Sequence, residues 1–122
     1  MTWKVNIDLE FLEEIRSFPE ETQTRIFFMV SILEIDGPEL GRPQVDTLHD
    51  SKHSNMKELR FNADDGVWRV AFAFDPKREA ILLVGGDKAG ENQKKFYKKL
   101  IKTADNRFNK HLEELKEGEK NA

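Results

Sequence analysis

Two arginines, Arg60 and Arg69, flank a short turn near the middle of the chain. The runs on both sides of the turn alternate apolar and polar residues, which is typical of half-buried strands. The arginines therefore lie on the same face of a predicted hairpin, and we expect that face to be exposed to solvent. Like charges on neighbouring strands repel each other, so the pair indicates a binding site for an anion.

The position of the turn decides how the two arginines meet. If Ala63–Gly66 form a four-residue loop, Arg60 lies directly opposite Arg69. If the turn is Asp65-Gly66 alone, Arg60 lies opposite Ala71 instead. The two guanidinium groups are then diagonal neighbours, and they share one face in either register.

A third cation, Lys88, follows the next predicted strand in the run Gly85-Gly86-Asp87-Lys88. Two glycines leave the backbone beside a sheet open, so a ligand can come close. Lys88 would then lie at the edge of the arginine face. The alternative is a glycine-rich connection with an incidental lysine. The glycines match neither a Walker motif nor a dinucleotide-binding fingerprint.

A metal-free cluster of cations can cleave RNA, because the ribose 2′-hydroxyl supplies the nucleophile. The planar fork of arginine matches phosphate oxygens and stabilises charge on the phosphorane. A lysine whose pKa is lowered by neighbouring cations can act as the base. Arg60, Arg69 and Lys88 are therefore the candidate catalytic residues.

Further basic residues surround this set. The last predicted helix has lysines on the side away from its apolar stripe: Lys94, Lys95, Lys98, Lys99 and Lys102. Lysines can contact phosphates, although a solvated helix face is the simpler interpretation for most of them. Lys94 and Lys95 are the best placed, since they lie in the first turns, nearest the sheet. Lys57, in the first hairpin strand, and His53, in the loop before it, complete the candidate RNA-binding residues.

His49 and His53 have the spacing of a metal-binding pair, with Asp46 and Asp50 close by. That spacing aligns two ligands only on a helix, whereas this stretch is predicted to be a loop, and no third ligand is evident. We therefore expect no metal and no other cofactor. His53 could act as a general acid or base, although a plain loop histidine is the simpler interpretation.

The charges of the 122-residue chain are distributed unevenly. Residues 1–51 hold 4 Lys and Arg against 11 Asp and Glu, whereas residues 52–111 hold 14 against 8. This asymmetry favours one anion-binding surface within an acidic protein, with an uneven solvated surface as the simpler alternative. The sequence has no cysteine, no apolar run of membrane-spanning length and no signal-peptide core. We expect a cytoplasmic protein that binds no membrane.

Hydrophobic periodicity divides the chain into helices and strands. The predicted bounds are a strand at 3–7, helices at 8–17 and 19–36, a long loop at 38–55, strands at 56–62, 67–75 and 80–86, and a helix from 91. This order predicts an α+β fold, in which an N-terminal helical hairpin and a C-terminal helix pack on a small, mostly antiparallel sheet. We expect a single domain at 1–116 and a disordered polar tail at 117–122.

Six short runs of the sequence carry a family resemblance. They are Leu40-Gly41-Arg42-Pro43, Asp46-Thr47-Leu48, Met56-Lys57-Glu58-Leu59-Arg60-Phe61, Val67-Trp68-Arg69-Val70-Ala71-Phe72, Ile81-Leu82-Leu83-Val84-Gly85-Gly86-Asp87-Lys88 and Ala104-Asp105-Asn106-Arg107-Phe108. In order and spacing they resemble the RelE/ParE toxin superfamily, close to its HigB-like branch. The resemblance covers most of the chain, from the first helices to about Leu112.

This resemblance implies a RelE-like fold and the toxin of a type II toxin–antitoxin pair. RelE- and HigB-type members cut messenger RNA on the ribosome without a metal and thereby inhibit translation. By position, Arg60 and Arg69 match the strand arginines that engage phosphate, and Lys88 matches the basic residue after the last strand. The partners implied are the ribosome, its message and a HigA-like antitoxin with a helix-turn-helix, which would also repress the shared operon.

Two features depart from the family pattern. The run Asp87-Lys88-Ala89-Gly90-Glu91-Asn92 replaces a Lys-Lys motif that many HigB-type toxins have here. The terminal catalytic tyrosine or histidine of some RelE-type enzymes has no clear counterpart. Tyr97 is the nearest candidate, but its place on the apolar stripe predicts a core role. The alternative functions are a ParE-like toxin that acts on gyrase through protein contacts and a non-catalytic nucleic-acid-binding module.

Overall fold

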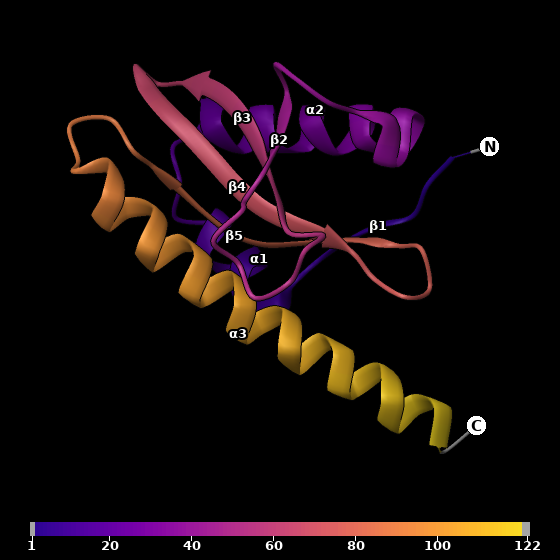
Figure 1. Cartoon of the computed structure of the whole chain (residues 1–122). Helices are drawn as coiled ribbons and strands as arrows, with labels where there is room; N and C mark the ends of the chain where they lie inside the picture. Colours follow the sequence, from indigo (N-terminus) through magenta and orange to yellow (C-terminus); the bar gives the residue numbers. More distant parts are fainter. Residues whose placement is uncertain (1, 121–122) are drawn as a thin grey trace.

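The computed structural model describes residues 2–120 (Figure 1). Along the chain its elements are β1 (Val5–Ile7), α1 (Leu9–Ile15), α2 (Glu20–Asp36), the short 3-10 helix η1 (Gly37–Glu39), β2 (Val45–Thr47), β3 (Lys57–Ala63), β4 (Gly66–Phe74), β5 (Ala80–Asp87) and α3 (Gln93–Lys120). Two helices precede the strand meander and a single helix follows it. The predicted α+β fold class is therefore confirmed.

Within residues 2–120, the strands form one sheet in the order β1-β5-β4-β3-β2. β1 runs parallel to β5, and the other neighbours are antiparallel. The edge strand β2 lies inside the stretch that we predicted to be a long loop, so that prediction was wrong there. β2 has 3 residues, and Val45 is buried opposite Leu59. Such a short strand shows too little alternation to be detected from sequence.

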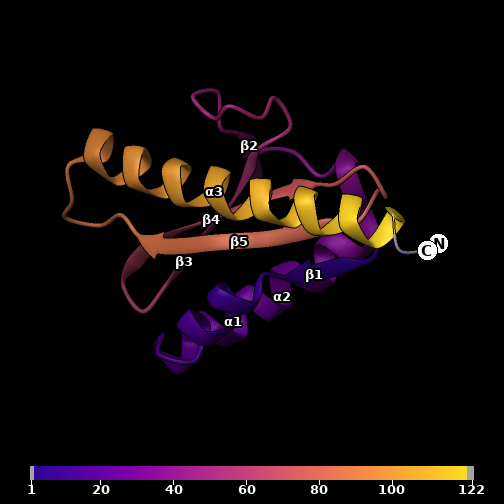
Figure 2. The ribbon, with the colours of Figure 1, turned by 90° about the horizontal axis from the view of Figure 1, so that it is seen from below.

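The sheet is the middle layer of three (Figure 2). α1 and α2 cover one face, over a core that includes Phe11, Leu33 and Phe72. α3 covers the other face, over a second core that includes Leu83 and Phe108. The continuous apolar run of β5 is buried between the two cores, as expected for a strand covered on both sides.

The hairpin of β3 and β4 turns through Asp64 and Asp65, whose φ angles are 49° and 58°. Two successive residues in the left-handed region make a tight turn whose twist suits a hairpin. Arg60 pairs with Arg69 across the hairpin. The direct pairing of the two arginines is therefore confirmed, and the register with a turn at Asp65-Gly66 was wrong.

α3 is the longest element and lies diagonally across its face of the sheet (Figures 1 and 2). The side chain of Asn92 caps its start, since Oδ1 accepts the N–H of Lys95 at 3.1 Å. We expected a disordered polar tail at 117–122. Residues 117–120 instead belong to this helix, which continues to Lys120. Residues 121–122 lie outside the described residues. No helix within 2–120 is long and apolar enough to cross a membrane.

Candidate active site

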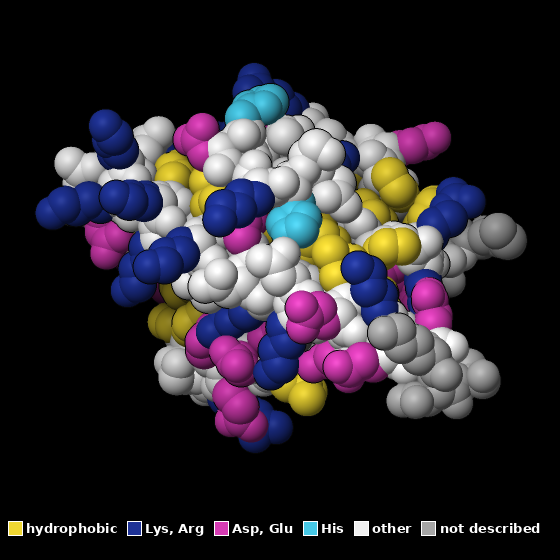
Figure 3. Space-filling model, turned by 60° about the horizontal axis from the view of Figure 1, so that its bottom comes forward, with side chains coloured by type: hydrophobic (Ala, Val, Ile, Leu, Met, Phe, Trp, Pro, Cys, Tyr) yellow, Lys and Arg dark blue, Asp and Glu magenta, His cyan; other side chains and the backbone are white. Residues whose placement is uncertain are grey.

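A groove of about 920 Å³ lies between α3 and the segment that begins at β2. One wall is the N-terminal half of α3, the other is formed by residues 46–50 with Lys52, and side chains of β3 contribute to the lining. The basic side chains that line it are Lys52, Arg60, Lys88, Lys94, Lys98 and Lys102. Figure 3 shows basic side chains gathered over the end of the molecule where α3 begins.

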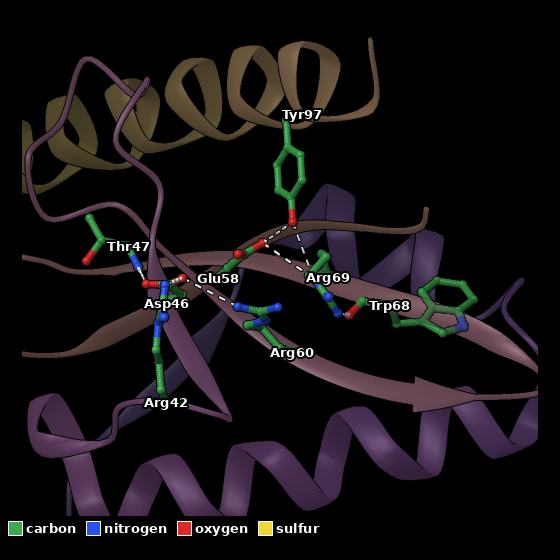
Figure 4. A network of polar contacts seen from close by, with 8 residues as sticks. All are labelled: Arg42, Asp46, Thr47, Glu58, Arg60, Trp68, Arg69 and Tyr97. Carbon is green, nitrogen blue, oxygen red and sulfur yellow. Dashed lines mark hydrogen bonds and ion pairs between the residues drawn. The ribbon is translucent and has the colours of Figure 1, made fainter. Parts of the chain in front are cut away.

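Glu58, Arg69 and Tyr97 form a hydrogen-bonded cluster beside this groove (Figure 4). The hydroxyl of Tyr97 points from α3 toward the sheet, where it donates to Glu58 Oε1 at 2.9 Å and accepts from Arg69 Nε at 3.3 Å. Arg69 Nε also lies 3.7 Å from Glu58 Oε1. Its Nη1 donates to the carbonyl of Trp68 at 2.9 Å. Groups from β3, β4 and α3 therefore hold one another in a fixed arrangement.

Arg69 is buried, so the prediction that both arginines face solvent was wrong. Its side chain is 7% exposed, against 33% for the side chain of Arg60 directly opposite. α3 packs over β4 and β5, whereas Arg60 lies further out, on β3 beside the edge strand. Of the two arginines, Arg60 is the one that lines the groove.

Gly86 lets α3 pack closely on the sheet. A Cβ at Gly86 would lie 3.2 Å from the ring of Phe96. Because Gly86 pairs with Arg69, this close approach brings Tyr97, the next residue of α3, over the buried guanidinium. The two glycines line a separate hollow on the other side of α3 and not the groove.

Burial shifts three pKa values around the cluster. It raises the pKa of Glu58, although the hydrogen bond from Tyr97 and the charge of Arg69 oppose this. Burial also raises the pKa of Tyr97, and the hydrogen bond to Glu58 adds to the effect. Burial and then the charge of Arg69 lower the pKa of Lys88. Groups whose pKa values are shifted by burial and by specific partners are candidates for acid and base catalysis.

Two cations of the groove, Lys88 and Arg60, lie beside this cluster. The ammonium of Lys88 lies 5.8 Å from the centre of the Tyr97 ring. Nη1 of Arg60 lies 3.4 Å from Oδ2 of Asp46, which also accepts from Nη2 of Arg42 at 2.8 Å. The hydrogen bond from Arg42 is the main cause of the lowered pKa of Asp46. An ionised carboxylate thus orients Arg60, whose fork has five N–H donors in all.

Of the four residues predicted to bind RNA, only Lys94 lies in the groove. Lys94 lines the groove, whereas Lys95 lines a separate hollow beside Gly85-Gly86. His53 Nε2 lies 2.7 Å from Asn109 Oδ1, so this histidine packs against α3. Neither His53 nor Lys57 is part of the groove lining.

Glu58 and Tyr97 are the groups of the site that the sequence interpretation missed. We predicted a core role for Tyr97, but its hydroxyl lies in the polar cluster. Two signals pointed toward the pair. Glu58 shares a hairpin face with Arg60 and Arg69, and a tyrosine hydroxyl on a buried stripe needs a hydrogen-bond partner. Neither signal predicts where α3 crosses the sheet, and it is this crossing that brings Tyr97 to Glu58.

Known proteins similar to this chain were found by sequence. A family described as phage derived protein Gp49-like matches residues 13–109. "Putative toxin HigB2" of Mycobacterium tuberculosis is 41% identical over 104 residues, which are 84% of this chain and 51% of that protein. "Putative toxin HigB3" of the same organism is 55% identical over 78 residues, or 64% of this chain and 66% of that protein. The chain thus spans about half to two thirds of the length of these curated relatives.

Two solved structures share the fold. The free-state structure of a mutant Escherichia coli toxin RelE has a TM-score of 0.59 and 9% identity, covering 83% of this chain and 95% of that one. A chain of the RelE–RelB complex from the archaeon Pyrococcus horikoshii has a TM-score of 0.53 and 22% identity, covering 74% and 99%. At these identities the similarity establishes a common fold.

Proposed function

This chain belongs to the Gp49-like family of phage-derived proteins, and from that premise we propose that it is the toxin of a type II toxin–antitoxin pair. We propose further that it is an endoribonuclease, which cleaves messenger RNA on the ribosome without a metal ion and so inhibits translation. The similarity to HigB2 and HigB3 and the RelE-like fold support the toxin assignment. The groove supports cleavage of RNA as its activity.

One observation carries the ribonuclease proposal: Arg60 and Lys88 meet the Glu58–Tyr97 pair in a single cationic groove. The cations can bind a phosphate and stabilise the charge that develops on it. The hydrogen-bonded pair offers a path for a proton. A binding surface alone would need the cations but not a buried carboxylate with a raised pKa.

In the proposed reaction, the ribose 2′-oxygen forms a bond to phosphorus and the bond from phosphorus to the 5′-oxygen breaks. The 2′-hydroxyl proton passes to the oxygen of Tyr97 as Tyr97 passes its own proton to Glu58. Lys88 gives a proton to the departing 5′-oxygen, and its lowered pKa makes it a stronger acid than an ordinary lysine. The products are a 2′,3′-cyclic phosphate and a 5′-hydroxyl.

The two arginines have different roles in this scheme. Arg60 contacts the phosphate, since its side chain lines the groove and is partly exposed. Arg69 is a positioning residue, because it lies beneath the groove and holds Tyr97 and Glu58 through its Nε. Its positive charge also helps to keep Glu58 ionised and so able to accept a proton.

The antitoxin is the second proposed partner, beside the ribosome and its message. One structural neighbour belongs to a complex of RelE with RelB. By that likeness, and by the HigB relatives, we propose a small helix-turn-helix antitoxin of the HigA type. A gene for such a protein beside the gene for this chain would support the pairing.

Induced expression in bacteria, followed by primer extension on cellular messages, tests the function. Discrete cuts in frame with codons are expected for the wild type and for Arg25→Ala, which removes an exposed arginine of α2. Arg60→Ala should relieve growth arrest and remove the cuts. DNA damage without cuts would favour a gyrase poison. RNA binding without cuts or growth arrest would favour a non-catalytic module.

A further inference from the structure

The lysines of α3 face two different sides of the helix. Lys94, Lys98 and Lys102 line the groove, whereas Lys95 and Lys99 line the separate hollow on the other side. Residues four apart lie on one side of an α-helix, and each step advances ~6 Å along the axis. The first three lysines, here called the lysine row, therefore form a slanted row of charge along one wall of the groove.

Three of the four acidic side chains that line the groove accept hydrogen bonds from groups outside this row. Glu58 accepts from Tyr97, and Asp46 accepts from two arginines. Asp105 accepts from Ser51 Oγ at 2.5 Å and from the backbone N–H of Lys52 at 3.0 Å. Among the ion pairs formed within residues 2–120, none includes a lysine of the row.

The rest of the lining includes apolar surface. The lining includes Leu48 on one wall and Ile101 and the ring of Tyr97 on the other. Single-stranded nucleic acids bind where a basic track follows the backbone and apolar or aromatic side chains meet the bases. In a duplex the bases are stacked inside and are not available for such contacts. The groove therefore suits an unpaired strand.

The two walls of the groove are fixed relative to each other by hydrogen bonds that do not involve the lysine row. The two hydrogen bonds to Asp105 fix the segment around Ser51 against α3, and Asp105 is buried. This contact also places Lys52 on the wall that faces the row. A strand in the groove would meet walls that are already in position, so less ordering is needed on binding.

We propose that Lys94, Lys98 and Lys102 hold three successive phosphates of an unpaired RNA strand that runs along α3. The strand reaches Arg60 and Lys88 at the end where α3 begins, because Lys88 precedes that helix by a short connection. The proposal rests on the proposed function in taking RNA as the ligand. It adds the path of the strand, its unpaired state and the residues that bind it beyond the reactive cluster.

Binding of a short, unstructured RNA with 2′-O-methyl groups tests the path separately from cleavage, because this RNA lacks the nucleophile. Fluorescence anisotropy at several salt concentrations gives the slope of log Kobs against log salt, about −0.7 for each phosphate contacted on a single strand. The triple variant K94Q/K98Q/K102Q should make the slope less negative by about 2. The control K99Q/K110Q/K116Q removes equal charge from exposed lysines of α3 outside the groove.

The expected result is a large change of slope for the row variant and a much smaller one for the control. Equal changes in both variants, or an unchanged slope in the row variant, would overturn the proposal. An RNA duplex that bound with the same slope change would also overturn it. If the wild type cleaved no message on ribosomes, the proposed function would be contradicted, but the binding result would still stand. A failure of the proposed function can therefore be distinguished from a failure of the proposed RNA path. Gln is a good helix former, and circular dichroism checks that both variants fold.

Discussion

The two faces of the sheet differ in what their helices bury. On the face under α1 and α2, the residues that β3 and β4 turn inward are apolar: Leu59, Phe61, Trp68, Val70 and Phe72. On the face under α3, the alternate positions of the same strands include Glu58, Arg60 and Arg69. The first face is an ordinary apolar core. The second departs from that pattern where polar residues become buried, and such departures are expected at functional sites.

The difference between the faces predicts that substitutions on them fail in different ways. Apolar-face variants should lose stability and keep whatever activity the folded fraction has. Polar-face variants should lose activity first, except where they leave a charge buried without its partner. Glu58 and the two arginines allow each part of this comparison to be tested.

Glu58→Gln should have the largest effect, on the rate of cleavage. Gln retains the shape and an acceptor for the Tyr97 hydroxyl but cannot take a proton, so we expect a loss of about 10²–10⁴-fold. Single-turnover cleavage of a message on ribosomes measures it, with Glu20→Gln, at an exposed position of α2, as the control. A wild-type rate for Glu58→Gln would remove this residue from the reaction.

The dependence of the cleavage rate on pH tests the proton-transfer roles of Glu58 and Lys88. The wild-type rate should rise with pH as Glu58 ionises, through a pKa that burial has raised. It should fall again at higher pH as Lys88 loses its proton, through a pKa that burial and Arg69 have lowered. Glu58→Gln should lose the rise at low pH and keep the fall.

Arg69→Ala should cost stability as well as activity. It leaves the carboxylate of Glu58 buried without its cation, and breaking a buried pair costs about 3–5 kcal/mol of unfolding free energy. Phe72→Ala on the apolar face is expected to cost a similar amount, about 3–5 kcal/mol, through its cavity. Urea unfolding followed by circular dichroism measures both.

A double variant distinguishes the two causes. E58Q/R69A removes both members of the buried pair and should recover most of the stability lost in Arg69→Ala. Adding Glu58→Gln to Phe72→Ala should bring no comparable recovery, since the two side chains lie on opposite faces. Equal instability of R69A and E58Q/R69A would show that the buried pair is not the reason for the loss.

A smaller effect is expected on the stability of Glu58→Gln as a function of pH. Because the pKa of Glu58 is higher in the folded state, the folded protein holds this proton more tightly than the unfolded chain does. Its contribution is present at low pH and is lost as pH rises from the ordinary value through the raised one. Tm of Glu58→Gln relative to wild type should therefore increase with pH across this window. A constant difference would contradict the raised pKa.

The sequence predicted the fold class and the placement of both arginines on one hairpin face, because local alternation of apolar and polar residues determines them. Alternation left two registers open, and the turn at Asp64-Asp65 in the structure selects the one in which Arg60 pairs with Arg69. The burial of Arg69 depends instead on where α3 crosses the sheet, which no local pattern encodes. The same long-range contact brings Tyr97 to Glu58, so the cluster was not predictable from either strand or helix alone.

The smallest predicted effect is a difference between Lys94 and Lys95 in the salt dependence of RNA binding. Lys94 and Lys95 were both predicted to bind RNA, yet Lys94 lines the groove and Lys95 lines the other side of α3. Lys94→Gln should make the salt slope of RNA binding less negative by about 0.7, and Lys95→Gln should change it much less. Equal changes would mean that the side of the helix does not matter.

The most direct test of the account compares Arg60→Ala with Arg25→Ala in the cleavage of a message bound to purified ribosomes. Each variant removes one arginine, from the groove in the first case and from the opposite side of the sheet in the second. Loss of a donor that stabilises the transition state should lower the rate for Arg60→Ala by about 10²–10³-fold, with Tm unchanged, while Arg25→Ala cuts at the wild-type rate. Cleavage by Arg60→Ala at the wild-type rate, or no cleavage by the wild type, would contradict the assignment of the groove as the site of RNA cleavage.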